Sequence, residues 1–370
     1  MGGDCLNYGC VPSKALIRSA RAWQEARQAA GRFGGPEVTA DGDFAAVMER
    51  MRQLRSGISE HDSARRFRDL GVDVFIGEGR FVAGDAVEVD GQRLVFRRAI
   101  IATGARPAAP PIPGLDEIDY LTSETFFTLD TLPKSLGIIG AGPIGCEMAQ
   151  TFARFGSRVE LFDVAPRVLP REDIDAAQCV HHALAADGVD LKLGSLIQSV
   201  RRSDGGITVD FERDDEPQQI EVEKLLVGVG RQPNVENLGL EAAGVEFDPF
   251  GVKVDDQLRT GNRKIFAVGD VASRFKFTHM ADALARIAIQ NALFFGRAKA
   301  SDLVVPWCTY TQPEVAHVGL YEEEAEDHGY SVEALTIPLA DVDRAKLEGA
   351  TEGFLRVVVQ KGKDRILGAT

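Results

Sequence analysis

The chain has 370 residues, of which 44% are hydrophobic and 26% are charged, a composition that excludes collagen-like, low-complexity and wholly disordered proteins. This length predicts two or three domains with sizeable cores. The formal net charge of −14 disfavours a general binder of nucleic acid or of anionic membranes. The sequence has no apolar run long enough to span a bilayer, no secretory signal pattern and only five cysteines, so we expect a reducing, cytoplasmic compartment.

The first third of the chain predicts helices followed by antiparallel strands. Helical patterns cover residues 14–30 and 44–70. Alternating patterns, separated by Gly and Asp, predict strands over 72–76, 86–89 and 93–96. A short buried strand over 99–102 leads to a Pro-rich connection at 107–113, which indicates a domain boundary.

From Pro133 onward, strands alternate with helices, which is typical of a parallel sheet. The predicted strands are 136–139, 158–162, 190–193, 225–229 and 264–268; the predicted helices are 144–155, 174–186 and 277–295; and 197–213 is a hairpin. Strands and a charged helix around 322–328 follow Pro306. The final run, 365–370, predicts the start of a strand with nothing after it to pair with or to cover it.

A glycine-rich turn stands between the strand at 136–139 and the next helix. Gly140-Ala141-Gly142-Pro143-Ile144-Gly145 fits G-x-G-x-x-G, and Asp163 ends the following strand. In this pattern the glycines allow a tight turn, a close approach to a pyrophosphate and close helix–strand packing, and the acidic residue binds ribose hydroxyls. Asp163 favours NAD over NADP, although Arg158 and Arg167 keep NADP open. The competing interpretation is a tight turn that binds no ligand.

Two cysteines stand close together near the start of the chain, in Cys5-Leu6-Asn7-Tyr8-Gly9-Cys10-Val11-Pro12-Ser13-Lys14. Gly9 and Pro12 predict a break in the helix between the thiols. A helix start and the Lys14 ammonium both favour a reactive thiolate. Three alternatives are inert buried cysteines, a zinc site and a structural disulfide. Inert cysteines would not explain the Gly–Pro distortion, and a zinc site would need further ligands that the sequence does not offer at suitable spacing. A structural disulfide is disfavoured in a reducing compartment. We therefore predict redox activity.

The stretch from Gly2 to Lys14 resembles the redox motif of the FAD-dependent pyridine nucleotide–disulfide oxidoreductases, which include dihydrolipoamide dehydrogenase, glutathione reductase and mercuric reductase. Five further stretches resemble motifs of this family in the family's order: Ala102–Gly104, Gly140–Glu147, Gly228–Asn234, Ile265–Asp270 and Thr311–Gly319. The resemblance implies an α/β fold with two Rossmann-like domains, for FAD and for NAD(P), and the start of an α+β dimerisation domain. It implies domain boundaries of 1–130 and 256–304 for FAD, 131–255 for NAD(P), and 305–370 for dimerisation.

The resemblance also implies roles for individual residues. Cys5 would be the interchange thiol and Cys10 the thiolate beside the flavin, while Lys14 would pair with Glu147 near the flavin's reactive edge. The FAD-binding residues implied are Lys14, Gly79, Thr103, Gly104, Gly269, Asp270, Phe277, Thr278 and His279. The NAD(P)-binding residues implied are Gly140, Gly142, Pro143, Ile144, Gly145, Glu147, Asp163, Ile197 and Gly230. We expect Cys146, Cys179 and Cys308 to be structural, and no metal site of the protein's own.

The implied reaction is a relay from NAD(P)H through FAD to a Cys5–Cys10 disulfide and then to a small-molecule or protein disulfide, or to Hg(II). Pro143 departs from the family where several members carry an aromatic residue, and 340–345 is closest to mercuric-reductase-like members. The resemblance implies a homodimer. We expect both ends of the chain to be shorter than the family pattern. The first flavin motif and the late His–Glu pair of the family would then be missing from the chain. The alternative is a catalytically poor chain that still binds a dinucleotide or a partner.

Overall fold

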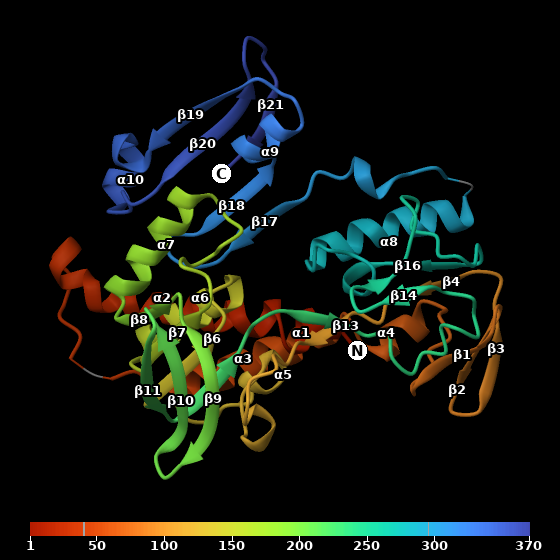
Figure 1. Cartoon of the computed structure of the whole chain (residues 1–370), viewed down its shortest axis with the longest axis horizontal. Coiled ribbons are helices and arrows are strands. Elements are labelled where there is room, and N and C mark those ends of the chain that lie inside the picture. The colour runs from red at the N-terminus through yellow and green to blue at the C-terminus, as the bar shows by residue number, and fades with distance from the viewer. Residues whose placement is uncertain (40, 295) are drawn as a thin grey trace. The chain divides into compact units, whose positions relative to one another are not determined.

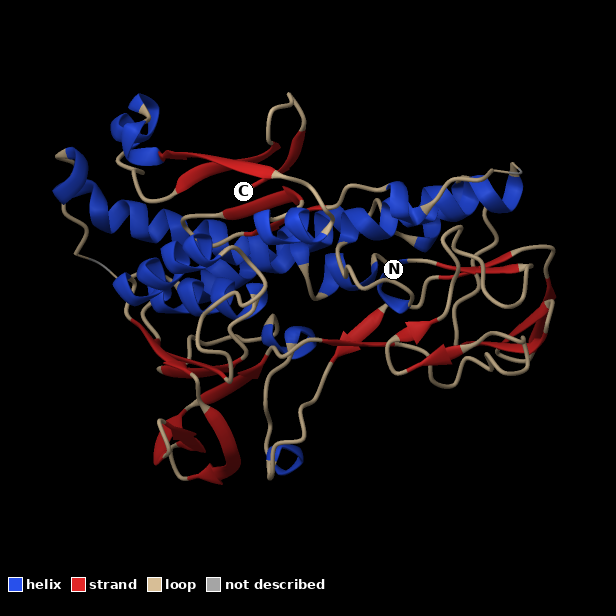
Figure 2. Cartoon of the chain, turned by 45° about the horizontal axis from the view of Figure 1, so that its top comes forward, coloured by secondary structure: helices blue, strands red, loops and turns tan. Residues whose placement is uncertain are grey.

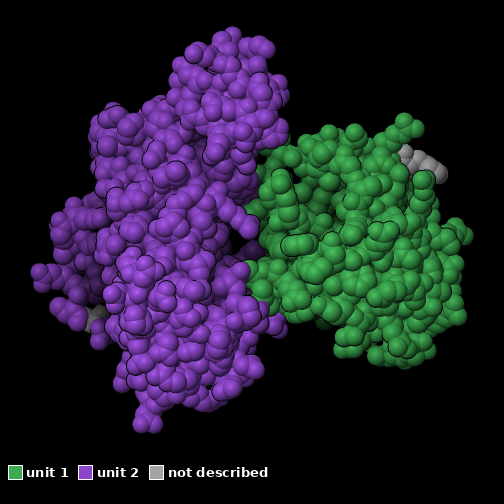
Figure 3. Space-filling model, viewed as in Figure 1, with its two compact units in different colours: residues 1–5, 59–108, 230–305 green, residues 6–58, 109–229, 306–370 purple. Residues whose placement is uncertain are grey.

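The computed structural model describes residues 1–39, 41–294 and 296–370. The chain divides into two compact units (Figure 3). Unit 1 comprises Met1–Cys5, Ser59–Ala108 and Gly230–Val305, and unit 2 comprises Leu6–Ile58, Ala109–Val229 and Pro306–Thr370. Each unit has hydrophobic clusters of its own, so each is a separately packed body.

Unit 1 consists of short strands and one long helix. Its strands are paired as β1 (Gly79–Ala83), β2 (Ala86–Val89) and β3 (Gln92–Val95); β4 (Ala99–Ile101) with β16 (Ile265–Ala267); β5 (Ala105–Pro107) with β13 (Arg231–Pro233); and β14 (Phe247–Asp248) with β15 (Gly251–Val252). Its helices are α4 (Ala64–Asp69), η2 (Gly269–Val271), α8 (Thr278–Leu293) and η3 (Ala300–Asp302). The apolar face of α8, with Met280, Leu284 and Ile287, packs on Phe266 of β16, which is why this helix lies along the parallel β4–β16 pair.

The centre of unit 2 is a parallel four-stranded sheet of order β12-β6-β7-β8. Its strands are β6 (Ser135–Ile139), β7 (Arg158–Asp163), β8 (Val189–Leu193) and β12 (Lys224–Val227), with α6 (Pro143–Phe155) and α7 (Ile174–Ala186) as the helical connections. The strands read as near-continuous apolar runs because helices cover a parallel sheet. An antiparallel sheet of β9 (Leu196–Ser203), β10 (Gly206–Arg213) and β11 (Glu216–Val222) lies between β8 and β12 in the chain (Figure 1).

Two helices of the N-terminal segment complete the core of unit 2. They are α2 (Cys10–Phe33) and α3 (Phe44–Ser59, whose last residue is assigned to unit 1); shorter elements are α1 (Gly3–Asn7), which continues from unit 1, η1 (Leu115–Glu117) and α5 (Ser123–Phe126). Leu16, Met48 and Phe152, from α2, α3 and α6, belong to one buried cluster. The helix that begins at Cys10 is therefore packed with the helix that follows the glycine turn.

The last segment of unit 2 forms a five-stranded sheet of order β17-β18-β21-β20-β19, labelled in Figure 1 and drawn as red strands near the C-terminus in Figure 2. Its elements are β17 (Pro306–Thr309), β18 (Val315–Gly319), α9 (Glu322–Asp327), β19 (Val332–Pro338), η4 (Leu339–Asp341), α10 (Asp343–Glu348), β20 (Phe354–Gln360) and β21 (Ile366–Ala369). The strand predicted at the end of the chain is present as β21. β21 pairs with both β18 and β20, so the chain supplies its partners from earlier in the sequence.

Two expectations are corrected by the structure, and two others are confirmed. The predicted helix over 44–70 is two helices, because Ser63 caps the start of α4 by accepting a hydrogen bond from the Arg66 amide. The predicted strand over 72–76 is not a strand, since among the described residues no neighbour forms a ladder with it. The hairpin over 197–213 is confirmed as β9 and β10, to which the structure adds a third strand, β11. The predicted helix over 277–295 is α8, and Phe295 lies outside the described residues.

Candidate active site

The glycine turn connects β6 to α6, and an added Cβ would meet different surroundings at each of its glycines. Gly140 has φ +106°, and a Cβ there would lie 2.7 Å from the Gly228 carbonyl oxygen. A Cβ on Gly145 would lie 1.8 Å from the Gly140 oxygen, so only glycine lets α6 approach the turn so closely. A Cβ on Gly142 would meet nothing within 4 Å. The protein itself therefore does not require a glycine at 142, and the open space there fits a pyrophosphate that approaches the backbone.

The start of α6 has the features of an anion site. Gly142 is the N-cap and Pro143 stands in the first turn, where its missing N–H breaks no helical hydrogen bond. Ile144 is 43% exposed. Free backbone N–H groups and the positive end of the helix dipole make such a terminus suited to a phosphate group.

Asp163 ends β7 beside this turn. Its Oδ2 accepts a hydrogen bond from the Ala141 amide at 2.6 Å and its Oδ1 accepts one from the Ala165 amide at 2.8 Å. The carboxylate thus holds the turn in place, a role that sequence reasoning did not foresee. Each carboxylate oxygen can accept a second hydrogen bond, so these contacts leave capacity for ribose hydroxyls.

Arg158 and Arg167, the two arginines that left NADP as an alternative nucleotide, both bind acceptors outside the glycine turn. Arg167 donates to the backbone oxygens of Glu172 at 2.9 Å and Pro170 at 2.6 Å. Arg158 pairs with Glu160 and donates to the Glu221 oxygen at 2.8 Å. Neither guanidinium is committed to the turn.

The cysteine pair spans a break between two helices, as the sequence predicted. Cys5 lies within α1, and Cys10 is the first residue of α2, with Gly9 as its N-cap. The first helical bond of α2 runs from the Ser13 amide to the Gly9 oxygen at 3.1 Å. Pro12 therefore stands in the first turn, where it is tolerated, and the clash that it would cause within a continuous helix is avoided.

Cys10 has an exposed side chain, while Cys5 is partly buried. A hollow of about 370 Å³ opens beside Cys10 between α2 and α3. Its lining includes Lys14, Arg18 and Arg50 as well as apolar side chains. Within unit 2, Cys10 is thus accessible from a hollow that carries positive charge.

Lys14 and Glu147 form an ion pair that joins the two helices. The Lys14 Nζ lies 2.9 Å from the Glu147 Oε2, and the Glu147 side chain is only 5% exposed. The other carboxylate oxygen, Oε1, accepts a hydrogen bond from the Tyr310 amide at 2.9 Å. The Lys14 ammonium also lies 4.3 Å from the centre of the Tyr310 ring, a cation–π arrangement. Glu147 thereby connects the cysteine helix, the helix that follows the glycine turn and the residue that directly follows β17.

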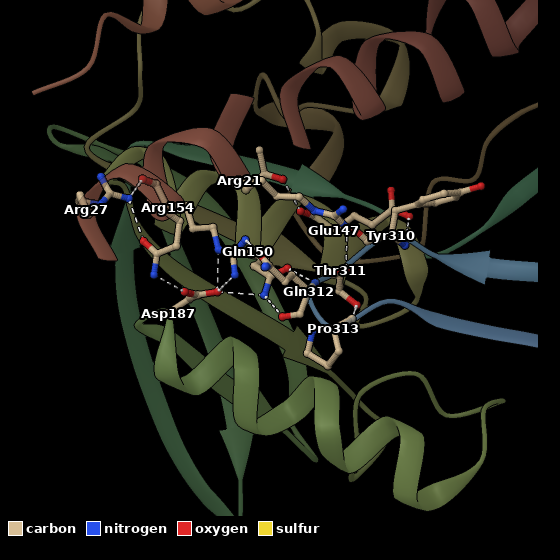
Figure 4. Close-up of polar contacts among 12 residues, drawn as sticks. Arg21, Arg27, Glu147, Gln150, Arg154, Asp187, Tyr310, Thr311, Gln312 and Pro313 are labelled. Carbon is tan, nitrogen blue, oxygen red and sulfur yellow. Dashed lines mark hydrogen bonds and ion pairs between the residues drawn. The ribbon is translucent and has the colours of Figure 1, made fainter. Parts of the chain in front are cut away.

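The polar face of α6 continues from Glu147 into a buried network (Figure 4). Gln150 donates to the Gln312 oxygen at 2.9 Å and accepts from the Gln312 amide at 2.8 Å. Arg154 donates through Nε to the Asp187 Oδ2 at 2.9 Å and through Nη1 to the Gln312 Oε1 at 2.6 Å. Burial lowers the pKa of Arg154, and the charge of Asp187 opposes that effect.

The same network receives arginines from α2. Arg21 donates to the Thr311 oxygen at 2.9 Å and to the Glu314 carboxylate at 2.8 Å, and Arg27 donates to the Arg154 oxygen. The peptide bond between Gln312 and Pro313 is cis. Side chains of α2 and α6 therefore hold the loop 310–314 from two sides.

The residues assigned to FAD in unit 1 lie at chain turns and at the start of α8. Gly104 has φ +69° and Gly269 has φ +72°. A Cβ on Gly104 would meet nothing within 4 Å, so this turn faces open space and leaves room for a ligand. Phe277 caps α8 and stacks on the His279 ring, with centroids 5.4 Å apart. Exposed backbone and an uncovered helix start fit a flavin better than they fit a packed core.

Asp270 follows Gly269 and is held by basic groups. Its Oδ2 lies 3.3 Å from the Arg231 Nε, and Arg231 also reaches Asp4, the residue before Cys5, at 3.2 Å. Burial raises the pKa of Asp270, and the charge of Arg231 opposes this. A carboxylate paired on one oxygen keeps acceptor capacity for sugar hydroxyls, so Asp270 fits the ribityl role that the resemblance implied.

The remaining assigned residues occupy varied positions. Thr103 donates to the Asn234 oxygen at 2.8 Å, and Thr278 is the first residue of α8. Gly79 begins β1, Ile197 lies in β9, and Gly230 has φ +130° just before β13. The roles of these residues toward a cofactor remain predictions.

The three other cysteines are poorly suited to thiolate chemistry. Burial raises the pKa of Cys146, whose thiol donates to the Ala141 oxygen at 3.3 Å. Burial also raises the pKa of Cys179, and it raises that of Cys308 to about 11. Thiols that stay protonated at neutral pH are weak nucleophiles.

No helix in the described part of the chain has the length and apolar character needed to cross a membrane. Residues 1–39, 41–294 and 296–370 also contain no group of three or more His, Cys, Asp or Glu side chains placed to hold a metal ion.

The fold and the glycine turn define an α/β protein of the dinucleotide-binding class. The family model for pyridine nucleotide-disulphide oxidoreductases matches residues 1–285, and the model for the dimerisation domain of that family matches residues 305–370. The chain therefore belongs to the pyridine nucleotide-disulphide oxidoreductase family, which confirms the resemblance and the predicted fold class.

Individual relatives cover the whole of this chain. It is 36% identical to the mercuric reductase of Bacillus cereus over 372 residues, and spans 58% of that protein's length. It is 31% identical to the dihydrolipoyl dehydrogenase of Bacillus subtilis (strain 168), of which it spans 80%. Among solved structures, the HOCl-induced flavoprotein disulfide reductase RclA from Escherichia coli matches with a TM-score of 0.86 and 30% identity, over 80% of that chain.

Sequence reasoning missed the residues that hold the Lys14–Glu147 pair in place. Tyr310 supplies both a backbone N–H and a ring, yet it stands one residue before the motif that begins at Thr311. The Arg154–Asp187 pair was also missed. Its only sequence signal is the spacing of Glu147, Gln150 and Arg154 at three and four residues, which places them on one helical face.

Proposed function

We propose that this chain is an NAD(P)H-dependent flavoprotein disulfide oxidoreductase in which Cys5 and Cys10 form the redox-active disulfide. One observation carries the proposal: Lys14, one turn after Cys10, is paired at 2.9 Å with Glu147, two residues after the last glycine of the dinucleotide turn. The pair joins the cysteine helix to the nucleotide helix within one packed unit.

FAD, when bound, supplies a carrier of two electrons between the nicotinamide and the disulfide. We assign its binding to the Thr103–Gly104 turn, to Asp270 and to the start of α8 at Phe277–His279. In this assignment Asp270 accepts hydrogen bonds from sugar hydroxyls. The Lys14 ammonium is oriented by Glu147 and by the Tyr310 ring, so that its charge stays fixed near Cys10.

The cysteines perform the exchange chemistry. The Cys5 thiolate attacks one sulfur of a substrate disulfide, the substrate S–S bond breaks, and the departing thiolate takes a proton. The Cys10 thiolate then attacks Cys5 in the mixed disulfide, which releases the second substrate thiol and restores the Cys5–Cys10 bond. NAD(P)H is the source of the two electrons that this cycle consumes.

We propose NAD rather than NADP as the preferred nucleotide. Asp163 places a carboxylate at the end of β7, where a 2′-phosphate would be repelled. Arg158 and Arg167, which could have offset that repulsion, are bonded to protein acceptors. We expect kcat/KM for NADH to exceed that for NADPH by at least about 10-fold, since a like-charge contact costs several kcal/mol. Equal values for the two nucleotides in steady-state assays would contradict this preference.

We propose a homodimer through the five-stranded sheet. One face of this sheet carries apolar side chains that are about half exposed: Leu335 (51%), Ile337 (52%), Leu355 (48%) and Ile366 (67%). The strand register places Ile337 beside Leu355 and Val359 beside Ile366, so these side chains share one face. An exposed apolar patch of this kind is typical of an association surface.

The substrate is proposed by class, from the relatives: a disulfide such as lipoamide, or Hg(II). The test is an NADH-dependent assay of the chain loaded with FAD, run in parallel with lipoamide, oxidised glutathione and Hg(II). We expect turnover with one of them in the wild type, and a loss of at least about 10³-fold in Cys5→Ser and in Cys10→Ser. Cys179→Ser removes a thiol outside the site and serves as the matched control. A Cys5→Ser variant with full activity would overturn the proposal, and NADH binding without turnover of any substrate would favour a binding role.

A further inference from the structure

The loop 164–173, which follows Asp163, is shaped by contacts with the glycine turn. The Leu169 amide donates to the Ala141 oxygen at 2.8 Å, and Leu169 has φ +46°, a strained conformation for a leucine. The Gly194 amide donates to the Ala165 oxygen at 2.9 Å. A strained backbone conformation persists only where surrounding contacts hold it in place. We therefore expect contacts that also fix the far end of this loop.

The far end is held by the five-stranded sheet. Glu172 is 8% exposed, and its carboxylate accepts the Trp307 Nε1–H at 2.9 Å and the Tyr321 hydroxyl at 2.6 Å. Trp307 lies in β17 and Tyr321 lies at the start of α9, so both belong to the dimerisation domain. A buried carboxylate without such donors would be costly, and these two contacts therefore set the position of Glu172.

Trp307 and Tyr321, which donate to Glu172, are themselves held in place by His317. Tyr321 stacks on His317 with ring centroids 3.7 Å apart, and Trp307 lies 4.6 Å from the same ring. His317 is 2% exposed and bonds to the Thr370 hydroxyl at 2.8 Å and to the Gly319 oxygen at 3.1 Å. Burial, reinforced by Glu172, raises the pKa of Tyr321, so its hydroxyl remains a donor over the whole working range of pH.

A second tie secures the next residue of the chain. Arg356 of β20 pairs with Asp173 at 2.7 Å and with Asp175 at 2.6 Å. Asp173 is also the N-cap of α7, where it accepts from the Asp175 amide at 2.9 Å. The loop therefore runs between two fixed points: Asp163 at the glycine turn, and Glu172 and Asp173, which are bound by residues of the dimerisation domain.

We propose that Trp307 and Tyr321 are positioning residues for the dinucleotide: they hold Glu172, and so fix the loop that forms one wall of the nucleotide site beside Asp163. This inference rests on the proposed binding of NADH at the glycine turn. It makes the dimerisation domain a determinant of nucleotide affinity as well as of association.

The test compares NADH binding in Trp307→Phe, Tyr321→Phe and the double variant of the full chain loaded with FAD. Each change removes one donor; Tyr321→Phe keeps the ring, and Trp307→Phe replaces the indole with a smaller aromatic ring. We expect KM and Kd for NADH to rise about 10-fold in the double variant while kcat changes less than about twofold, because an unfixed loop lowers the population of the binding-competent state. Tyr330→Phe, a hydroxyl removed from the same domain away from Glu172, is the matched control and should leave both values unchanged.

Two further measurements separate positioning from a merely structural role. Hydrogen exchange of residues 164–173 should quicken in the double variant and slow again when NADH is added. Glu172→Gln should lose part of the affinity, because its amide oxygen can accept from the Tyr321 hydroxyl while its amide nitrogen, itself a donor, faces the Trp307 N–H, whereas Glu172→Ala should behave as the double variant does.

The outcomes are distinguishable from failure of the proposed function. If wild-type chain fails to bind NADH, the proposed function fails. If wild type binds NADH and the double variant binds it with the same Kd and unchanged loop exchange, the positioning role is overturned, even where the thermal stability falls.

Discussion

The two parts of helix α6 work by different physical means. At its N-terminus, backbone geometry decides the arrangement: Gly140 and Gly145 are required because a Cβ would strike a carbonyl oxygen. Along its body, side chains decide it: Glu147, Gln150 and Arg154 bind groups that lie 133, 162 and 158 residues away in the chain, at Lys14 and Gln312. One helix thus carries a local motif and a long-range junction.

The two parts of α6 therefore differ in how far each can be recognised from the sequence alone. A glycine motif is local, so its steric demands can be recognised in the sequence. A network of charged side chains acquires its meaning only when the chain has folded and the distant partners arrive. The following predictions separate the two parts of α6, from the largest expected effect to the smallest.

The largest effect should come from the buried ion pair in the helix body. The side chains of Arg154 and Asp187 are both 7% exposed, so Asp187→Ala leaves a buried guanidinium without its counter-charge. We expect the free energy of unfolding in urea to fall by about 3–5 kcal/mol. The control is Asp343→Ala, which breaks an exposed pair with Lys346 and should cost less than about 0.5 kcal/mol. Equal losses in the two variants would show that the network is not a structural junction.

The next effect concerns the glycine turn. Gly145→Ala places a methyl group 1.8 Å from a carbonyl oxygen and should lower the free energy of unfolding by about 1–3 kcal/mol. Gly142→Ala has open space and φ −75°, so its stability should change by less than about 0.5 kcal/mol. Gly142→Ala should nevertheless weaken NADH binding, measured by fluorescence titration, because its methyl group occupies the proposed pyrophosphate space. Unchanged NADH affinity in Gly142→Ala would contradict that placement.

A smaller effect should appear at alkaline pH through Cys146, which lies on α6 between the two parts. Burial raises the pKa of this thiol above its ordinary value of about 9, so the unfolded chain loses this proton first as pH rises. Its stabilising contribution is complete below about pH 9 and is lost at higher pH, by up to about 1.4 kcal/mol per pH unit. Denaturation of wild type and Cys146→Ala between pH 8 and 10.5 should show the shallower slope in the variant; identical slopes would exclude this origin.

Much of the fold could be predicted from the sequence. The strand–turn–helix around Gly140–Gly145 and the helix break at Gly9 were both correct, because local sterics determine them. The strand predicted at the end of the chain is present as β21, whereas its pairing with β18 was not foreseen, because β18 stands far earlier in the sequence. Local pattern cannot report such pairings.

The candidate site shows the same division. The family pattern led to Lys14 and Glu147, and the structure places them in contact. The amide of Tyr310 and the Trp307 and Tyr321 donors carry no signature in the sequence, because aromatic residues at strand ends serve packing far more often than positioning. The contribution of Asp163 to the turn backbone was hidden behind its expected role toward ribose.

The most direct test of the proposed relay is differential alkylation of the FAD-loaded chain under anaerobic conditions, before and after addition of one equivalent of NADH. Mass spectrometry then assigns the modified cysteines. We predict that Cys5 and Cys10 are protected as a disulfide before NADH and are both alkylated after it, while Cys146, Cys179 and Cys308 do not change between the two states. Alkylation of Cys5 and Cys10 that is independent of NADH would contradict the proposal that they are the redox-active pair.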